Sequence, residues 1–168
     1  MKSNITLIGM PGAGKSTVGV VLAKVMGYGF IDSDLVIQEK TGRLLSEIIA
    51  EKGTEGFLQV EDEINAELEC EKSVIATGGS AVYCKNAMVH LKEISTVIYL
   101  KMPYEKVEKR LGNLKDRGVA LKDGQTLKDL YEERCPLYEK YADVVVEADT
   151  TSVEECMRKI LEQYHKCA

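Results

Sequence analysis

A glycine-rich stretch near the N-terminus constrains the chain most. Residues 9–17 read Gly-Met-Pro-Gly-Ala-Gly-Lys-Ser-Thr and match the pattern G-x-x-x-x-G-K-[ST]. The stretch follows the apolar run 5–8 and leads into residues 18–25, whose apolar positions have helical spacing. A strand, a glycine-rich turn and a helix in this order form a phosphate-binding loop, because backbone N–H groups and a helix N-terminus both attract anions. The alternative, a glycine-rich turn that matches by chance, is disfavoured by this context. We therefore predict nucleotide binding.

The loop also predicts its own chemistry. The side chain of Lys15 is placed to reach the β- and γ-phosphates of a bound nucleotide. The hydroxyl of Ser16 is placed to bind Mg²⁺. We expect ATP and Mg²⁺ to be the cofactors.

Length, charge and cysteine content exclude several classes of protein. A chain of 168 residues is expected to form one domain with a real core. Its net charge of −5 disfavours a nucleic-acid-binding protein, which needs basic surface. The five cysteines form no C-x-x-C pair, and no apolar run has the length of a signal peptide or a membrane span. We expect a cytoplasmic protein with free thiols; a reactive thiol is the alternative for one of them.

Apolar runs of strand length alternate with helical segments along the whole chain. Strands are predicted at 5–8, 28–31, 74–76, 96–100 and 143–146. Helices are predicted at 15–26, 34–40, 44–51, 55–70, 87–91, 104–111, 126–141 and 152–165. This alternation predicts an α/β fold with a doubly wound, five-stranded parallel sheet and a ligand site at the carboxyl ends of its strands.

Polar motifs follow the second and third predicted strands. Asp32-Ser33-Asp34 supplies two carboxylates that could hold Mg²⁺ or a substrate hydroxyl, and helix capping is the alternative for one of them. Gly78 and Gly79 would let backbone amides approach a ligand, or would only form a tight turn. The third strand does not end in an acidic residue, so Asp32 is the nearest candidate to support Mg²⁺.

Two arginines are further candidates. Arg117 lies in the polar segment 112–124, which has the composition of a mobile lid; an arginine there could stabilise transition-state charge, with surface solvation as the alternative. Lys115 is a second cation in that segment. Arg134 lies in the helical segment 126–141, where pairing with neighbouring glutamates is the alternative to a binding role.

Taken together, these motifs resemble the shikimate kinase family over nearly the whole chain. The matching features are the phosphate-binding loop, Asp32-Ser33-Asp34, Phe57 with Glu61, the glycine pair, Lys109-Arg110, the lid and the run 134–138. The resemblance implies a P-loop kinase of the nucleoside monophosphate kinase type, with acceptor-binding helices at about 33–70 and a lid at about 112–124. It also implies a role in aromatic amino acid biosynthesis.

The resemblance assigns roles position by position. The ATP phosphates would be bound by Gly12, Ala13, Gly14, Lys15, Ser16 and Thr17. Ser16 would bind Mg²⁺ and Asp32 would support it, while Arg110 and Arg117 would contact ATP. Asp34 would orient the attacking hydroxyl, Gly78 and Gly79 would contact the acceptor, and Arg134 would bind its carboxylate. Lys15, Asp34 and Arg117 would be the catalytic residues.

Two single positions and one short run depart from the family pattern. Leu58 stands where the family has an arginine that binds the substrate carboxylate together with the later arginine. Without that arginine the site lacks one charge-assisted hydrogen bond, worth about 1.5–3 kcal/mol. Ser80 stands where the family has a third glycine, and residues 117–120 read Arg-Gly-Val-Ala in place of an arginine-proline-dileucine run. Glu61 is left without its usual cation. The ATP side of the site is kept and the acceptor side is partly changed.

We therefore expect an ATP-dependent phosphotransferase, acting as a monomer, whose acceptor is shikimate or a shikimate-like polyhydroxylated metabolite. One alternative is a kinase of the same fold for another polyol or a nucleoside monophosphate, although the chain has only five arginines for a second phosphate. A non-catalytic ATP-binding regulator is the other.

Overall fold

The structure is a computed structural model that describes residues 2–111, 122–149 and 152–167. The strands are β1 (Asn4–Ile8), β2 (Gly29–Asp32), β3 (Ser73–Ala76), β4 (Ser95–Lys101) and β5 (Val144–Glu147). The helices are α1 (Lys15–Met26), α2 (Ser33–Thr41), α3 (Leu45–Ala66), α4 (Lys85–Ile94), α5 (Tyr104–Arg110), α6 (Leu127–Tyr141) and α7 (Val153–Cys167), with a short 3₁₀ helix η1 (Ala81–Tyr83).

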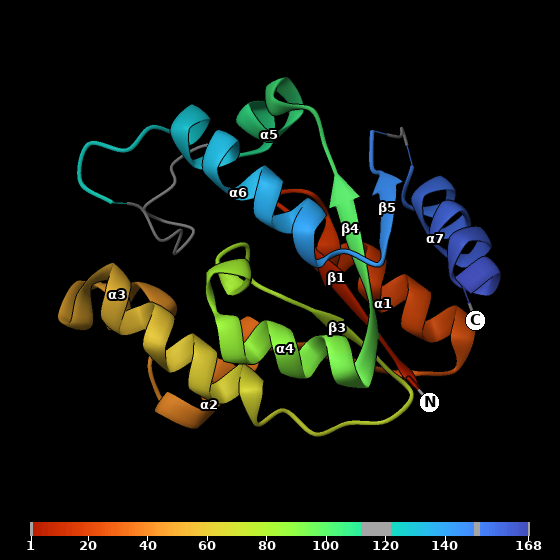
Figure 1. Ribbon diagram of the computed structural model, residues 1–168, viewed down its shortest axis with the longest axis horizontal. Helices are drawn as coiled ribbons and strands as arrows, with labels where there is room; N and C mark the ends of the chain where they lie inside the picture. Colours follow the sequence, from red (N-terminus) through yellow and green to blue (C-terminus); the bar gives the residue numbers. More distant parts are fainter. Residues whose placement is uncertain (1, 112–121, 150–151, 168) are drawn as a thin grey trace.

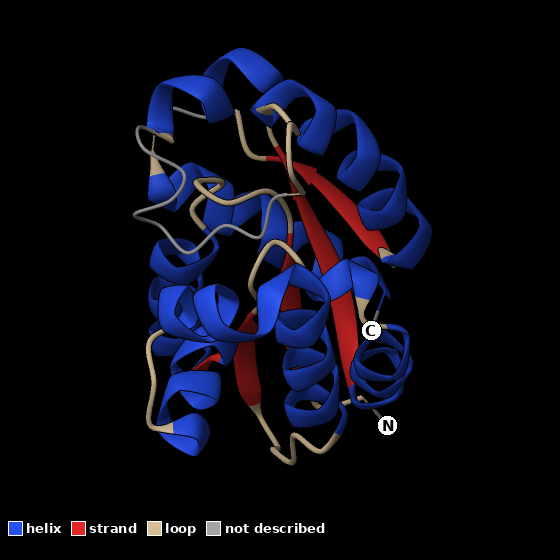
Figure 2. Ribbon diagram, turned by 90° about the vertical axis from the view of Figure 1, so that its left-hand side faces the viewer, coloured by secondary structure: helices blue, strands red, loops and turns tan. Residues whose placement is uncertain are grey.

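The five strands form one parallel sheet in the order β2-β3-β1-β4-β5. Helices cover both faces of this sheet, with α1 and α7 packed together on one face and α4 and α6 against β4 on the other (Figure 1, Figure 2). The doubly wound five-stranded fold predicted from the sequence is confirmed. The order reverses at β1, so the loop after β1 lies at the switch point where ligands bind in such sheets.

Burial explains why the strands were visible in the sequence. All five residues of β1 and all four of β3 are buried, as strands covered on both faces must be. Each predicted strand agrees with the observed one to within two residues. The strand-end motifs consequently meet along one edge of the sheet.

The prediction for the segment 44–70 needs one correction. The element α3 consists of two helical stretches separated at Gly53, whose φ of 72° and ψ of 178° are non-helical and favour glycine, so the two helices expected at 44–51 and 55–70 are confirmed. The second half ends at Ala66 and not at residue 70. Beyond it the chain turns, the N–H of Leu68 bonds the carbonyl of Asn65, and the Leu68 side chain enters the core.

A small second core joins α2 to α3, apart from the main core around the sheet. It contains Ile37, Ile48 and Phe57, with Leu58 half-buried against them. Burying a side chain such as Phe57 contributes about 2 kcal/mol, so this cluster fixes α2 and α3 relative to each other. In the part of the chain that the structure describes, no helix is long and apolar enough to span a membrane.

Candidate active site

A cavity of about 390 Å³ opens beside the carboxyl ends of β1, β2 and β3. Its walls come from the phosphate-binding loop, from the start of α2 and α3, from the loop after β3 and from α6. The lining residues are Pro11, Gly12, Gly14, Lys15, Ser16, Thr17, Asp34, Leu45, Phe57, Thr77, Gly78, Gly79, Ser80, Leu111 and Arg134.

The phosphate-binding loop is held by its own lysine. The ammonium group of Lys15 donates hydrogen bonds to the carbonyls of Gly9 (2.7 Å) and Met10 (2.8 Å). Burial lowers the pKa of Lys15 to about 8, and the neighbouring Asp34 carboxylate opposes that shift. Gly14 begins α1 with a φ of 90°, which turns the loop into the helix. The lysine is thus preorganised at the rim of a helix N-terminus, where phosphate binds favourably.

Asp32 links this loop to the end of β2. Its Oδ2 accepts a 3.0 Å hydrogen bond from the Ser16 hydroxyl, and its Oδ1 accepts one from the backbone N–H of Asp34 at 3.0 Å. The carboxylate therefore caps α2 and also lies beside Ser16. The capping alternative and the metal-supporting hypothesis are compatible, because each uses a different oxygen.

Asp34 lies deep in the cavity against the glycine pair. A Cβ atom at Gly78 would be 2.6 Å from Asp34 Oδ1. Burial and, to a smaller extent, the neighbouring Asp32 carboxylate raise the pKa of Asp34 to about 6, and Lys15 opposes the rise. Asp34 thus presents a largely ionised carboxylate to the cavity at neutral pH, a group that could orient a hydroxyl.

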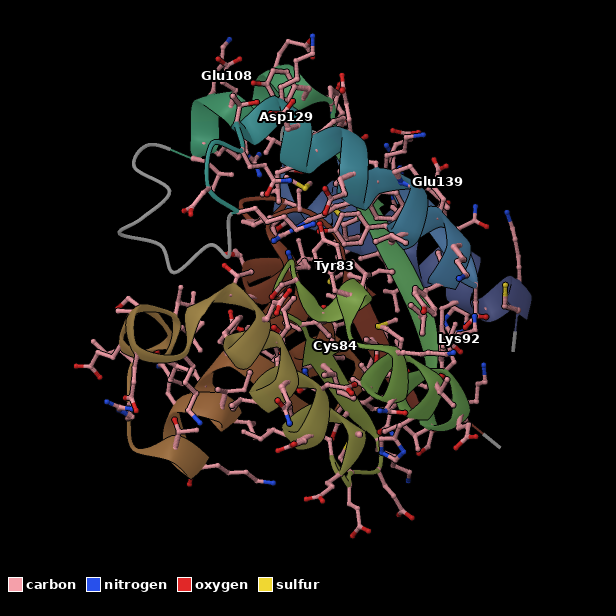
Figure 3. All side chains as sticks on the ribbon, turned by 60° about the vertical axis from the view of Figure 1, so that its left-hand side comes forward. Tyr83, Cys84, Lys92, Glu108, Asp129 and Glu139 are labelled. Carbon is pink, nitrogen blue, oxygen red and sulfur yellow. The ribbon has the colours of Figure 1, made fainter. Side chains whose placement is uncertain are left out.

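Arg134 occupies the opposite wall. Its side chain is 1% exposed, and its guanidinium lies 5.3 Å from the centre of the Tyr83 ring. A Cβ atom at Gly79 would lie 2.9 Å from Arg134 Nη1 and 2.7 Å from Pro11 Cδ, so the chain needs glycine there. The hydroxyl of Tyr138, one helical turn after Arg134, donates a 2.7 Å hydrogen bond to the Gly79 carbonyl. Figure 3 shows Tyr83 at the end of η1, on the side that faces α6. Arg134 therefore faces the cavity, unlike the exposed glutamates that precede it on α6.

Behind the cavity wall, Glu61 and Ser80 contact each other. The Ser80 hydroxyl donates a 2.6 Å hydrogen bond to Glu61 Oε2, and the Glu61 side chain is completely buried. Burial raises the pKa of Glu61 to about 7, although the Ser80 hydrogen bond opposes the rise. Leu58, three residues earlier on α3, is absent from the cavity lining and packs in the apolar cluster between α2 and α3.

A second cavity of about 180 Å³ adjoins the outer side of the phosphate-binding loop. It is lined by Ala13, Gly14, Thr17, Val18, Arg110, Ala148, Ser152, Val153 and Cys156. Arg110 Nη1 donates a 3.1 Å hydrogen bond to the Gly12 carbonyl, which places its guanidinium at the border between the two cavities.

The structure thus brings together most of the residues singled out from the sequence. Nine of them line the larger cavity: Gly12, Gly14, Lys15, Ser16, Thr17, Asp34, Gly78, Gly79 and Arg134. Ala13 and Arg110 lie in the second cavity, and Asp32 contacts Ser16. Arg117 and most of the expected lid lie outside the described residues.

Sequence reasoning missed several contributors. Tyr83 and Leu45 carried no recognisable signal, because their positions depend on how η1 and α3 pack. Tyr138 did carry a sequence signal, because it lies four residues after Arg134 and so lies on the same face of the helix. The Ser80–Glu61 contact joins one departure from the family pattern, Ser80, to the glutamate that the other departure, Leu58, leaves without its usual cation.

Comparison with known proteins decides the family. The family model for shikimate kinase matches residues 11–165. The chain belongs to the shikimate kinase family. A curated shikimate kinase from Shewanella sp. (strain ANA-3) is 38% identical over 165 residues, which cover 96% of each chain. A shikimate kinase from Histophilus somni (strain 2336) is also 38% identical over 165 residues, 96% of this chain and 94% of the relative.

Solved structures agree. A shikimate kinase from Acinetobacter baumannii in complex with shikimate has a TM-score of 0.89 and 33% identity, covering 99% of this chain and 94% of the other. One from Aquifex aeolicus has a TM-score of 0.81 and 31% identity over 96% of both chains. A gluconokinase from Sinorhizobium meliloti, at 17% identity and a TM-score of 0.57, shares the fold alone. This shikimate kinase family member is a P-loop phosphotransferase that uses ATP, and the regulator alternative is set aside.

Proposed function

We propose that this kinase transfers the γ-phosphate of ATP to a hydroxyl of a small polyhydroxylated acid, shikimate or a close analogue. The observation that carries the proposal is one cavity in which Asp34 and Arg134 flank the glycine pair while Lys15 lies at its phosphate-binding edge. The family relationship and the structural neighbour that holds shikimate support the choice of acceptor.

The residues divide the chemistry between them. Phosphoryl transfer passes through a loose transition state, so catalysis consists of positioning and charge neutralisation. Asp34 would orient the attacking hydroxyl towards the γ-phosphate and accept its proton, while Arg134 would bind the acceptor carboxylate. Lys15 would stabilise charge that develops on the phosphate oxygens. We propose the same role for Arg117.

The residues of the phosphate-binding loop and the end of β2 also suit a nucleotide and its metal ion. The Ser16 hydroxyl and the Asp32 carboxylate are oxygen donors 3.0 Å apart, which fits Mg²⁺. When bound, Mg²⁺ would neutralise charge on the β- and γ-phosphates. Gly12, Ala13, Gly14 and Thr17 would contact the phosphates. Arg110, at the second cavity, would lie along the base.

The remaining assignments follow from the same comparison. We propose that the chain is a single kinase domain, with acceptor-binding helices at about 33–70 and a lid at about 112–124. All five cysteines are free thiols, which supports a reducing compartment such as the cytoplasm.

One observation favours a different acceptor within the same reaction class. Arg134 is the only arginine among the described residues that line the larger cavity, because position 58 is a leucine packed against the apolar cluster. A single arginine binds a carboxylate less tightly than two. The second candidate is therefore another polyol whose acid group is smaller, weaker or absent.

ADP release coupled to an optical assay tests both candidates. The acceptor panel contains shikimate, cyclic and linear polyols, hydroxy acids and nucleoside monophosphates. We expect turnover with shikimate or another hydroxy acid. Asp34→Ala should abolish that turnover while ATP affinity stays within about twofold, and Glu39→Ala, an exposed carboxylate on the same helix, should leave both unchanged. Transfer to nucleoside monophosphates alone, or native activity in Asp34→Ala, would refute the proposal.

A further inference from the structure

Glu61 on α3 is a buried carboxyl group that forms no ion pair with any residue the structure describes. Its side chain is 0% exposed, and its Oε1 makes no hydrogen bond to any described residue. No ion pair formed by the described residues includes Glu61. Its Oε2 has one partner, the neutral hydroxyl of Ser80. A buried carboxylate in this position is costly unless it takes up a proton.

Charged groups on three helices act on Glu61. Asp34 on α2 and Asp62 on α3 disfavour the ionised form, while Arg134 on α6 favours it. Asp62 is occupied by hydrogen bonds from Asn86 Nδ2 (2.9 Å) and the N–H of Ala87 (2.7 Å). The charge of Glu61 contributes to the raised pKa of the Cys84 thiol, which follows η1. This thiol donates a hydrogen bond to the Leu58 carbonyl at 3.4 Å. Arg134 is thus the one cation among the described groups that act on Glu61.

Arg134 would also be the cation that binds the acceptor carboxylate. Glu61 lies behind the wall that Arg134 faces, since Ser80, which donates to Glu61, directly follows Gly79, where a Cβ atom would be 2.9 Å from Arg134 Nη1. With the acceptor carboxylate in place, two negative charges would lie near one guanidinium in a buried site, which makes it costly for both to stay ionised. The acceptor would also be held in the cavity by its hydroxyl contacts and would keep its charge. Glu61 would therefore be the carboxylate that takes up a proton. Ser80 can keep donating to Oε2 after the proton has been added, since Oε1 makes no hydrogen bond to a described residue.

We propose that Glu61 is a positioning residue that takes up one proton from solvent when a carboxylate-bearing acceptor binds beside Arg134, with Ser80 holding it in place. The inference rests on the proposed function. The proton ends on a carboxyl oxygen of Glu61 and leaves as the product dissociates, so no net change in protons results from this step.

The direction of the effect follows from the linkage. Below about pH 7 much of Glu61 already carries the proton, and acceptor binding requires no further uptake. At higher pH each binding event must take a proton from buffer, so the KM for an anionic acceptor rises towards a limit of about tenfold per pH unit. An uncharged acceptor should show no such rise.

The primary experiment measures proton uptake on the native enzyme. Shikimate is titrated into the protein near pH 8 by calorimetry, in two buffers with different ionisation enthalpies. We expect an uptake of close to one proton for shikimate and none for its methyl ester. Zero uptake, or proton release, with shikimate would overturn the inference.

Variants assign the proton to the residue. In Glu61→Gln the uptake and the rise of shikimate KM with pH should both disappear, whereas Glu55→Gln, an exposed carboxylate on the same helix, should behave as the native protein. A pH profile in Glu61→Gln equal to the native one would overturn the inference. If Glu61→Gln does not fold, Ser80→Ala replaces it. Removing the donor to the ionised form should move the KM rise to higher pH, and an unmoved profile refutes the role of the pair.

These outcomes separate the two proposals. If no hydroxy acid is bound or phosphorylated, the proposed function is refuted, and the inference about Glu61 is refuted as well. If shikimate is turned over but its binding is independent of Glu61 and of pH, only this inference fails.

Discussion

The carboxylate of Asp34 lies directly against Gly78, so that a methyl group on Gly78 would come within 2.6 Å of Asp34 Oδ1 and 3.4 Å of the carboxyl carbon. Asp34 lies in the first turn of α2, directly after β2, and Gly78 lies in the loop after β3; the two strands pair in the sheet. The position of the proposed hydroxyl-orienting group therefore depends on the absence of a side chain in the neighbouring loop.

Gly78→Ala should impair catalysis although the catalytic residue Asp34 itself is not replaced. The new methyl group would push the Asp34 carboxylate aside, and a displacement of about 1 Å can cost about a hundredfold in kcat. We expect such a loss in steady-state assays, with the Kd for ATP unchanged. The double variant Gly78→Ala, Asp34→Ala should be no slower than Asp34→Ala, because both act on one group. If the losses in kcat of the two single variants add in the double variant, Gly78 does not act through Asp34.

Lys15→Ala should reduce turnover with every acceptor. The ammonium group now donates to the Gly9 and Met10 carbonyls, at the place where the proposed mechanism puts developing phosphate charge. Loss of such a group costs about a hundredfold or more in kcat. Lys24→Ala, an exposed lysine on the same helix, is the matched control. Unchanged kcat in Lys15→Ala would remove the phosphate-binding loop from the mechanism.

The fold and the ATP side of the site were predictable because their signals are local. The buried strands β1 and β3 are apolar runs, and the loop 9–17 carries its function in consecutive residues. Asp34 and Gly79 could be placed because parallel strands end at one edge of the sheet.

The acceptor side was less predictable because its contacts are long-range. The Ser80–Glu61 hydrogen bond joins residues 19 positions apart, and it exists only because α3 packs behind the loop after β3. The sequence showed that position 58 had lost an arginine but not what Glu61 contacts instead.

Tyr138→Phe should weaken acceptor binding and leave ATP binding intact. The buried Tyr138 hydroxyl donates a 2.7 Å hydrogen bond to the Gly79 carbonyl, and its loss leaves that carbonyl without this donor at a cost of about 1–3 kcal/mol. We expect a lower Tm and an acceptor KM raised about fivefold or more, measured with saturating ATP. Tyr141→Phe, on the same helix but outside the cavity lining, serves as control. An effect confined to the KM for ATP would contradict the assignment.

Glu61→Gln should change how the stability of the ligand-free protein depends on pH. Folding raises the pKa of Glu61 from 4.5 to about 7, because the side chain is buried. Between these values the native state holds a proton that the unfolded chain has released, so the free energy of unfolding falls as pH rises through this window. The loss by about pH 8 amounts to roughly 3 kcal/mol in the native protein. A neutral amide does not titrate, so Glu61→Gln should not show that loss.

Urea unfolding at about pH 5 and pH 8 measures the difference in the free energy of unfolding, with Glu55→Gln as the exposed control. Parallel pH profiles for the native protein and Glu61→Gln would mean that Glu61 ionises normally despite its burial.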